Sequence, residues 1–211
     1  ASLVYQSGQH LLSLINDVLD ISKLETGRIA IQPREFDLYS VLDGLKQMFS
    51  LRAAEKQLDL LVTHTADVPR YIRTDLPRLR QILVHLLSNA VKFTQEGNVE
   101  LHIRTCPEQK DAKRPSGITL QFSISDTGPG ISHDEFETIF EAFVQTKAEK
   151  GWQEGAGLGL AICYQFAQLL GGELDVESQI GMGSTFTFTL PCESPQSSQS
   201  HKAHTVRYSA D

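Results

Sequence analysis

The order of helix-like and strand-like segments is the feature that most restricts the fold of this chain. Four segments carry apolar residues at helical spacing, namely residues 3–24, 36–55, 79–92 and 158–170. Seven shorter segments have the composition and alternation of strands, namely residues 28–32, 58–63, 71–74, 99–105, 118–125, 173–177 and 184–190. Their order lacks the strict strand-helix-strand rhythm of a doubly wound sheet. We therefore predict an α+β fold, a two-layer α/β sandwich in which three helices cover one face of a mixed sheet.

Residues at the ends of these segments support the boundaries. Asp37 and Asp75 are expected to cap the helices that follow them, and Pro77 is tolerated in a first turn. Gly171 follows the last helix, where glycine commonly ends a helix. A short helix is also expected near residues 133–140.

Composition excludes several classes of function. Lys and Arg number 19 against 26 Asp and Glu, a net charge of −7, and no basic stripe is present, so no nucleic-acid partner is expected. The three cysteines lack the spacing of a disulfide framework or a zinc site. No apolar run reaches the roughly 18 residues that cross a bilayer. We therefore expect a cytoplasmic location, within a parent protein that is longer and can be membrane-anchored.

The first helical segment has an unusually wide apolar face. Two adjacent seams of apolar residues run along residues 3–24, which suits a helical bundle better than a two-stranded coil. We expect three parts in the chain. Residues 1–27 form the bundle helix, residues 28–192 form the globular domain, and residues 193–211 form a polar tail or linker.

The helix predicted over residues 79–92 also has a polar side. His85, Asn89 and Lys92 stand at positions i, i+4 and i+7 and share one side of that helix. An Asn amide oxygen is a hard, neutral ligand for Mg²⁺, and a Lys one turn along supplies a point charge for phosphate. A solvated face of an amphipathic helix would have the same pattern, so this segment alone does not distinguish a metal-nucleotide site from an ordinary surface.

Three glycine-bearing segments follow. In residues 126–131, Asp-Thr-Gly-Pro-Gly-Ile, a carboxylate at a strand end can accept the amine proton of adenine, and the glycines allow close backbone approach. Residues 155–160, Gly-Ala-Gly-Leu-Gly-Leu, open a helix, whose free N–H groups favour phosphate. Residues 181–186, Gly-Met-Gly-Ser-Thr-Phe, read as a hairpin turn or as a further binding segment. Each segment alone also fits an ordinary turn.

The order and spacing of these segments resemble the ATP-binding catalytic domain of sensor histidine kinases, within the ATPase superfamily shared with gyrase, mismatch-repair ATPases and a heat-shock chaperone. The matching motifs are the N box at residues 87–94, the G1 box at 126–131, the F box at 139–143, the G2 box at 155–160 and a last glycine box at 181–186. The first helix is similar to the second helix of the dimerisation hairpin in hybrid-type kinases.

The resemblance implies ATP and Mg²⁺ as ligands. It assigns Asn89 to Mg²⁺, Lys92 to phosphate and Asp126 to the adenine amine. The other nucleotide-binding residues that it implies are Phe93, Gly128, Gly130, Ile131, Gly155, Gly157, Leu158, Gly159 and Thr185, with Thr185 behind the adenine. Residues 145–156, including Lys147 and Lys150, would form a lid over the nucleotide. Phe140 and Phe143 would lie in the core or against the closed lid.

Two departures from the family pattern affect the chemistry. His85 stands where these kinases commonly have Asn and where the hydrolytic relatives have an acidic base. A neutral His can orient water near the metal, so His85 is our candidate catalytic residue. The family phosphorylates a His followed by an acid and Arg-Thr-Pro, which this sequence lacks. Of its seven histidines only His133 precedes an acid, and we expect it to be a surface residue. The chain should bind ATP without phosphorylating itself.

For the parent protein, the resemblance implies transfer of the ATP γ-phosphoryl group to a hairpin histidine, relay to the receiver domain of a response regulator, and homodimerisation through the hairpin helices. Two alternatives stay open. One is a catalytically silent nucleotide-binding or partner-binding module that regulates another kinase. The other is an ATP-hydrolysing conformational machine, which would require an acidic base in place of His85.

Overall fold

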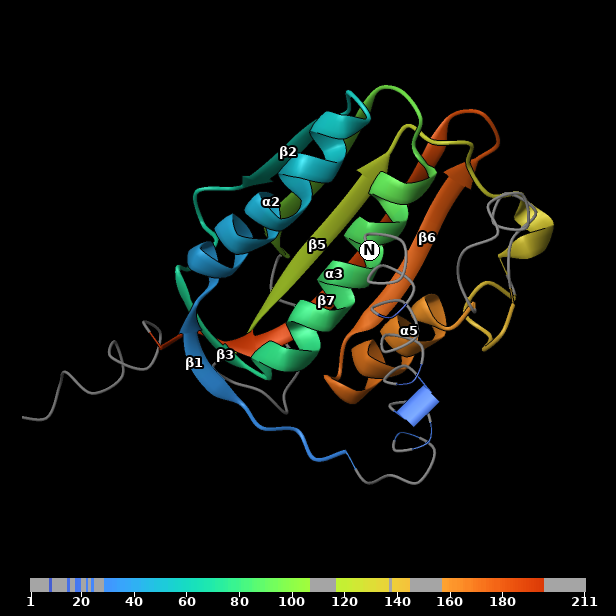
Figure 1. The fold of residues 1–211 in the computed structure, drawn as a ribbon. Helices are drawn as coiled ribbons and strands as arrows, with labels where there is room; N and C mark the ends of the chain where they lie inside the picture. Colours follow the sequence, from blue (N-terminus) through green and yellow to red (C-terminus); the bar gives the residue numbers. More distant parts are fainter. Residues whose placement is uncertain are drawn as a thin grey trace, which may run out of the picture.

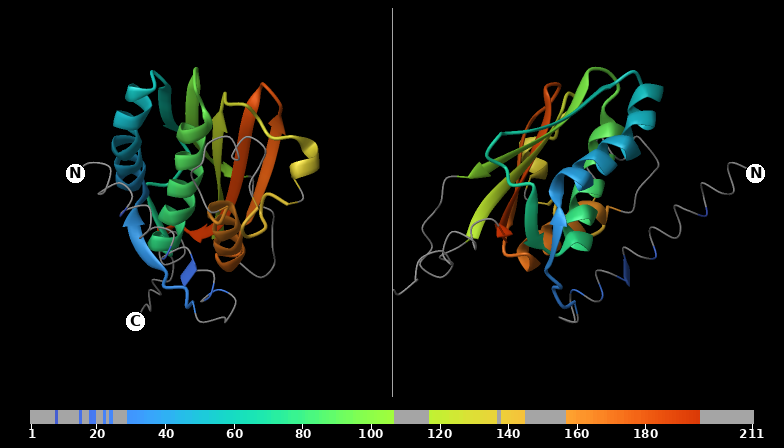
Figure 2. Two further views of the ribbon diagram at one scale, coloured as in Figure 1. Left: turned by 45° about the vertical axis from the view of Figure 1, so that its right-hand side comes forward. Right: turned by 90° about the vertical axis from the view of Figure 1, so that its left-hand side faces the viewer.

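A computed structural model describes residues 29–106, 117–136, 138–144 and 157–195, together with positions 8, 15, 18, 19, 22 and 24. A mixed seven-stranded sheet forms one layer (Figure 1). The helices α2 (Leu38–Glu55), α3 (Leu76–Phe93) and α5 (Gly159–Leu169) form the other layer. Figure 2 shows all three on the same face of the sheet. The predicted two-layer α+β sandwich is therefore confirmed.

The sheet has the strand order β1-β3-β7-β5-β4-β2, with β6 also paired to β7. The strands are β1 (Arg34–Asp37), β2 (Asp59–His64), β3 (Tyr71–Thr74), β4 (Asn98–Cys106), β5 (Gly117–Asp126), β6 (Glu173–Gln179) and β7 (Gly183–Glu193). Strand β2 pairs with β4 in parallel, and the other described pairs are antiparallel. The long antiparallel neighbours β5 and β7 run through the centre of the sheet, and the end of β5 at Asp126 pairs with the start of β7 at Ser184.

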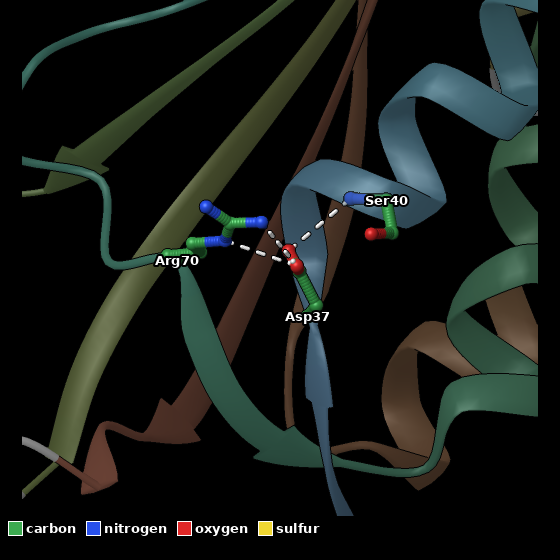
Figure 3. Close-up of polar contacts among 3 residues, drawn as sticks. All are labelled: Asp37, Ser40 and Arg70. Carbon is green, nitrogen blue, oxygen red and sulfur yellow. Dashed lines mark hydrogen bonds and ion pairs between the residues drawn. The ribbon is translucent and has the colours of Figure 1, made fainter.

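Helix α2 begins where the sequence places its cap. The Asp37 carboxylate accepts a hydrogen bond from the Ser40 backbone N–H at 3.2 Å and forms an ion pair of 2.9 Å with Arg70 (Figure 3). The strand predicted at residues 28–32 is wrong, because residues 29–33 form no strand and β1 begins after Pro33. Pro33 has no N–H to donate to a ladder, and the pairing with β3 starts at the residue after it.

Helix α3 carries the strongest local signals. The buried carboxylate of Asp75 accepts the N–H of Arg78 at 3.2 Å and that of Gln32 at 2.8 Å, so it caps the helix and ties it to the segment before β1. The apolar face predicted from the sequence is buried against the sheet, with Leu79, Ile82, Leu83, Leu86, Leu87 and Val91 all 4% exposed or less. The polar side of this helix is therefore left for the site.

Several other expectations meet the structure at element ends. Among the described residues of the helix expected over 133–140, only His133–Glu135 are helical, as a 3₁₀ turn, and His133 is exposed as predicted. Strand β7 extends to Glu193 rather than ending at Leu190, because its last residues pair with β5 and β3. The six described positions within residues 8–24 are helical. The bundle role of that segment and the division into 1–27, 28–192 and 193–211 stay predictions.

Parts of the predicted organisation lie outside the described residues, among them the loop 107–116, the lid 145–156 and the tail from residue 196. Among the helices that the structure does describe, none combines the length and the apolar character needed to traverse a bilayer.

Candidate functional site

A cavity of about 450 Å³, part of which is open solvent, lies where the second half of α3 meets the ends of β5 and β7. Four separate stretches of sequence line it, and their residues are Asn89, Ala90, Phe93, Asp126, Pro129, Gly130, Ile131, Leu160, Ser184 and Phe186. Five of the predicted nucleotide-binding residues are in this set: Asn89, Phe93, Asp126, Gly130 and Ile131. Residues 89 and 126, which come from different elements, therefore share one cavity.

Helix α3 supplies one wall of the cavity. Asn89 and Phe93 line it one turn apart, whereas the Lys92 ammonium lies 4.9 Å from the centre of the Phe93 ring, beside the cavity. His85 is one turn before Asn89 and lies close to the start of α5, because a Cβ on Gly159 would be 3.3 Å from its Nδ1. Of the three polar residues predicted to share one helix face, Asn89 thus lines the cavity, whereas His85 and Lys92 are not among its lining residues.

Asp126 is held at the end of β5 by hydrogen bonds to its own carboxylate. The Gly128 backbone N–H donates to Asp126 Oδ1 at 2.8 Å, which closes the turn that follows the strand. Burial raises the pKa of the Asp126 carboxyl above its ordinary value, and backbone hydrogen bonds from Gly128 and Ser184 offset part of that shift. The site therefore contains a partly desolvated carboxylate in a fixed orientation.

The loop after Asp126 is fastened to the β6–β7 hairpin. Gly130 has a positive φ of 71°, and a Cβ there would lie 2.1 Å from the Gln179 carbonyl oxygen, so only glycine allows this approach. The Ile131 N–H donates to Ser178 Oγ at 2.8 Å, and the Gly181 N–H donates to the Pro129 carbonyl at 2.8 Å. The hairpin thus forms the support of the loop, in addition to being a turn.

Thr185, which the resemblance places behind the adenine, is not among the residues that line this cavity. Thr185 Oγ1 lies 2.9 Å from Ser125 Oγ, whereas Ser184 and Phe186 line the cavity. Successive side chains of a strand point to opposite faces, and Ser184 shares the face of the buried Phe186. Gly183 precedes it with a φ of 98°, and a Cβ there would lie 1.9 Å from the Asp126 carbonyl oxygen. This close approach brings Ser184 beside Asp126.

Helix α5 supplies the remaining wall through Leu160. Gly159 is its first residue, and Leu158, at the N-cap, is buried in the core and makes no side-chain hydrogen bond to the helix. The Phe143 N–H donates to the Gly157 carbonyl at 3.0 Å. This bond joins the residues just before and just after the segment 145–156. Gly155, Lys147 and Lys150, which the sequence assigns to the site, are outside the described residues.

The two phenylalanines of the predicted F box have different environments. Phe140 packs against the core and stacks on Tyr164 with ring centres 5.3 Å apart. Phe143 is 70% exposed and has a positive φ of 66°, so a place in the core is wrong for it. Five further cavity residues lie within the matched motifs but receive no individual role from the sequence: Ala90, Pro129, Leu160, Ser184 and Phe186. The alternation of β7 would have identified Ser184 and Phe186.

Comparisons with known proteins agree on one family. The family described as histidine kinase-, DNA gyrase B- and HSP90-like ATPase matches residues 74–194. Hybrid signal transduction histidine kinase B of Dictyostelium discoideum is 36% identical over 190 residues, which are 90% of this chain and 9% of that protein. The autoinducer 2 sensor kinase/phosphatase LuxQ of Vibrio vulnificus is 38% identical over 188 residues, which are 89% of this chain and 22% of that protein.

Among solved structures, full-length ShkA in complex with AMPPNP matches with a TM-score of 0.76 and 36% identity. The match covers 92% of this chain and 38% of that one. The chain thus spans well under half the length of each of these three similar proteins.

Proposed function

Because the chain belongs to the histidine kinase-, DNA gyrase B- and HSP90-like ATPase family, as the catalytic domain of a sensor histidine kinase, we propose that its cavity binds Mg²⁺-ATP and presents the γ-phosphoryl group for transfer to a histidine. The observation that carries this proposal is the convergence of Asn89 and Asp126 on one cavity. A neutral oxygen ligand for a hard cation and a buried carboxylate for a base amine suit the two ends of a nucleotide.

Asp126 is proposed to accept a hydrogen bond from the adenine amine. The glycine-containing loop after it, with Gly128, Gly130 and Ile131, would border the base, and Phe93 and Phe186 would supply apolar contact. Burial of the carboxylate favours this role, because a charge-assisted hydrogen bond is stronger in a site with little water. Thr185 is proposed to lie behind the adenine, next to Ser184, which lines the cavity.

Asn89 is proposed to hold Mg²⁺ against the phosphates. The described residues contain no group of three or more His, Cys, Asp or Glu side chains that could hold a metal by themselves. That fits Mg²⁺, which commonly keeps several waters and is shared between one or two side chains and substrate phosphates. Mg²⁺ would neutralise phosphate charge, and Lys92, at the border of the cavity, would add a second positive charge.

The start of α5 is proposed to face the phosphates. Gly157 and Gly159, with Gly155 and the lid 145–156, would bring backbone N–H groups and the positive end of the helix toward negative charge. Leu158 would contribute through its backbone, since its side chain is buried in the core. His85 lies next to Gly159 and is proposed to act catalytically by orienting water near the metal.

The acceptor histidine would come from outside this sequence, since none of its seven histidines has the sequence context of the family's acceptor. We propose that the chain alone binds ATP and does not phosphorylate itself. In a parent protein, a homodimer through hairpin helices in the cytoplasm would supply the acceptor, and a response-regulator receiver would take the phosphoryl group. The hybrid kinases that the chain resembles support this assignment.

A titration with a fluorescent ATP analogue, with and without Mg²⁺, tests the proposal. We expect saturable binding that Mg²⁺ strengthens in the wild type and that Mg²⁺ no longer strengthens in Asn89→Ala. Addition of the hairpin of a related kinase with labelled ATP should then give acid-labile phosphate on the hairpin, and His85→Ala should lower that yield. Failure to bind nucleotide at millimolar concentration would favour a partner-binding module instead.

A further inference from the structure

The side chain of Lys56 makes an unusual set of hydrogen bonds. Lys56 follows the last residue of α2, and its ammonium donates to three backbone carbonyls at the end of α3, those of Val91 at 2.8 Å, Lys92 at 2.6 Å and Thr94 at 3.3 Å. The last carbonyls of a helix lack partners within the helix, and they carry the negative end of its dipole. One cation at the end of the neighbouring helix α2 therefore supplies partners to three carbonyls of the C-terminal turn of α3.

That turn is part of the cavity. Phe93 lines the cavity within it, and Asn89 lies one turn earlier. Thr94, which is fully buried, donates from its hydroxyl to the Ala90 carbonyl at 2.7 Å. A Cβ on Gly128 would lie 3.4 Å from Thr94 Oγ1. The turn held by Lys56 thus packs directly against the loop that follows Asp126, which also lines the cavity.

The environment of Lys56 is costly for a cation without partners. Burial lowers the pKa of its ammonium, and the nearby charge of Lys92 lowers it further. Charge-assisted hydrogen bonds to several carbonyls offset such a cost. No ligand atom is needed to account for the position of Lys56, which makes its effect on a ligand indirect.

We propose that Lys56 is a positioning residue for nucleotide binding, which fixes the last turn of α3 so that Asn89 and Phe93 keep their place in the cavity that Asp126 also lines. This inference rests on the proposed function. The nucleotide itself contacts α3 and the glycine-containing loop, and Lys56 acts on both through the carbonyls of Val91, Lys92 and Thr94.

Three variants test the inference. Lys56→Met removes the donors and keeps most of the side-chain volume, Lys56→Arg restores charge and several donors, and Lys46→Met is the control on the exposed face of α2. We expect Lys56→Met to weaken binding of the fluorescent ATP analogue about fivefold, within the roughly 2- to 30-fold range of indirect effects. Lys56→Arg should recover most of that loss, and Lys46→Met should bind like the wild type.

Hydrogen exchange followed by mass spectrometry gives a readout that does not depend on nucleotide. Lys56→Met should exchange faster than the wild type in peptides covering residues 90–98, with little change in β5 and β7. Should Lys56→Met fail to fold, Lys56→Gln replaces it, because glutamine is uncharged and its donor group is on a shorter side chain. We expect the same weaker binding and faster exchange from Lys56→Gln.

The outcomes separate the inference from the proposed function. If the wild type binds nucleotide and Lys56→Met, or Lys56→Gln in its place, matches it in affinity and in exchange, the role of Lys56 is refuted and the proposed function stands. If the wild type binds no nucleotide, the proposed function fails, and the role of Lys56 in binding fails with it. Loss of affinity that Lys56→Arg does not recover would also overturn the inference.

Discussion

Replacement of Asp126 by asparagine separates the ligand contact of this residue from its effect on stability. The amide has nearly the shape of the carboxylate, and its oxygen can still accept the Gly128 N–H that Asp126 Oδ1 accepts at 2.8 Å. The substitution removes the negative charge and exchanges one acceptor oxygen for a donor NH₂ group. The turn after β5 should therefore persist while recognition of the base changes.

The loss of affinity can be estimated from the bond that is removed. A hydrogen bond to a charged group contributes about 1.5–3 kcal/mol, which corresponds to roughly 10- to 150-fold weaker ATP binding in Asp126→Asn. Guanine carries a carbonyl oxygen where adenine carries its amine. An amide NH₂ can donate to that oxygen, so the variant should lose less affinity for GTP than for ATP, or gain some.

Stability should change in the opposite direction. Burial raises the folded-state pKa of Asp126 above its ordinary 3.8, so the folded protein holds the proton more tightly than the unfolded chain. Ionisation of this carboxyl therefore costs stability as the pH rises above that value. Asp126→Asn, which cannot ionise, should be as stable as the wild type or more stable at neutral pH. The difference should shrink as the pH approaches 3.8.

Two assays measure these effects. Urea unfolding at several pH values measures the stability, and competition of ATP and GTP against the fluorescent analogue measures the affinities. Asp175→Asn, at an exposed position of β6, is the matched control and should change neither. Wild-type ATP affinity in Asp126→Asn would refute the role of this carboxylate in base recognition. A lower urea midpoint at neutral pH would refute the reasoning from burial.

Three further predictions concern other parts of the fold. Gly181→Ala should lower the free energy of unfolding by about 1 kcal/mol, because Gly181 has a positive φ, and Gly130→Ala should lower it by more than twice as much. Gly130 also has a positive φ, but a Cβ there would in addition lie 2.1 Å from a backbone oxygen. Urea unfolding of the two variants compares them. Burial raises the pKa of the Cys192 thiol to about 12, so iodoacetamide should label Cys106 well before Cys192, as read by mass spectrometry. Asp37→Ala should lower the thermal midpoint at neutral pH, and the loss should fade in acid, since the adjacent guanidinium lowers the pKa of that carboxyl.

The sequence predicts best those features whose causes are local. The start of α3 follows from Asp75 and Pro77, and its buried face follows from the spacing of apolar residues, because capping and amphipathicity act within one or two turns. The start of α2 at Asp37 follows from the same rule. The strand before it was misplaced because residues 28–32 alternate like a strand, while the partner strand β3 pairs only with residues after Pro33.

Register is harder to predict than element type, as β7 shows. The strand is expected from its alternating residues, yet the resemblance names Thr185 and not Ser184, which is the residue that lines the cavity. A shift of one residue moves a side chain to the other face of the sheet. The burial of Phe186 and Phe188 fixes the face, and Ser184 lies on it. The motif alone did not carry that information, whereas the alternation did.

The convergence of the cavity is not a local property. Asn89 and Asp126 come from different elements, and from the sequence they were brought together only by the resemblance to a known family. Lys56 was not identified because its partners lie 35 to 38 residues further along the chain. No pattern around Lys56 distinguishes it from the exposed Lys46 of α2. Contacts of this kind appear only once the helices are packed.

The described wall around Asp126 is built largely from contacts of the chain with itself. The Ile131 N–H bonds to Ser178 Oγ, and Ser178 Oγ donates to the Gly183 carbonyl, so one hydroxyl joins the glycine-containing loop to the start of β7. These bonds need no ligand, and they orient Asp126 before a nucleotide binds. The entropy cost of ordering this wall is therefore met when the domain folds. Binding of the base then loses less entropy, which raises the affinity. Base selectivity should therefore be a property of the folded domain itself, whereas the proposed phosphoryl transfer also requires an acceptor histidine, which we propose comes from outside this sequence.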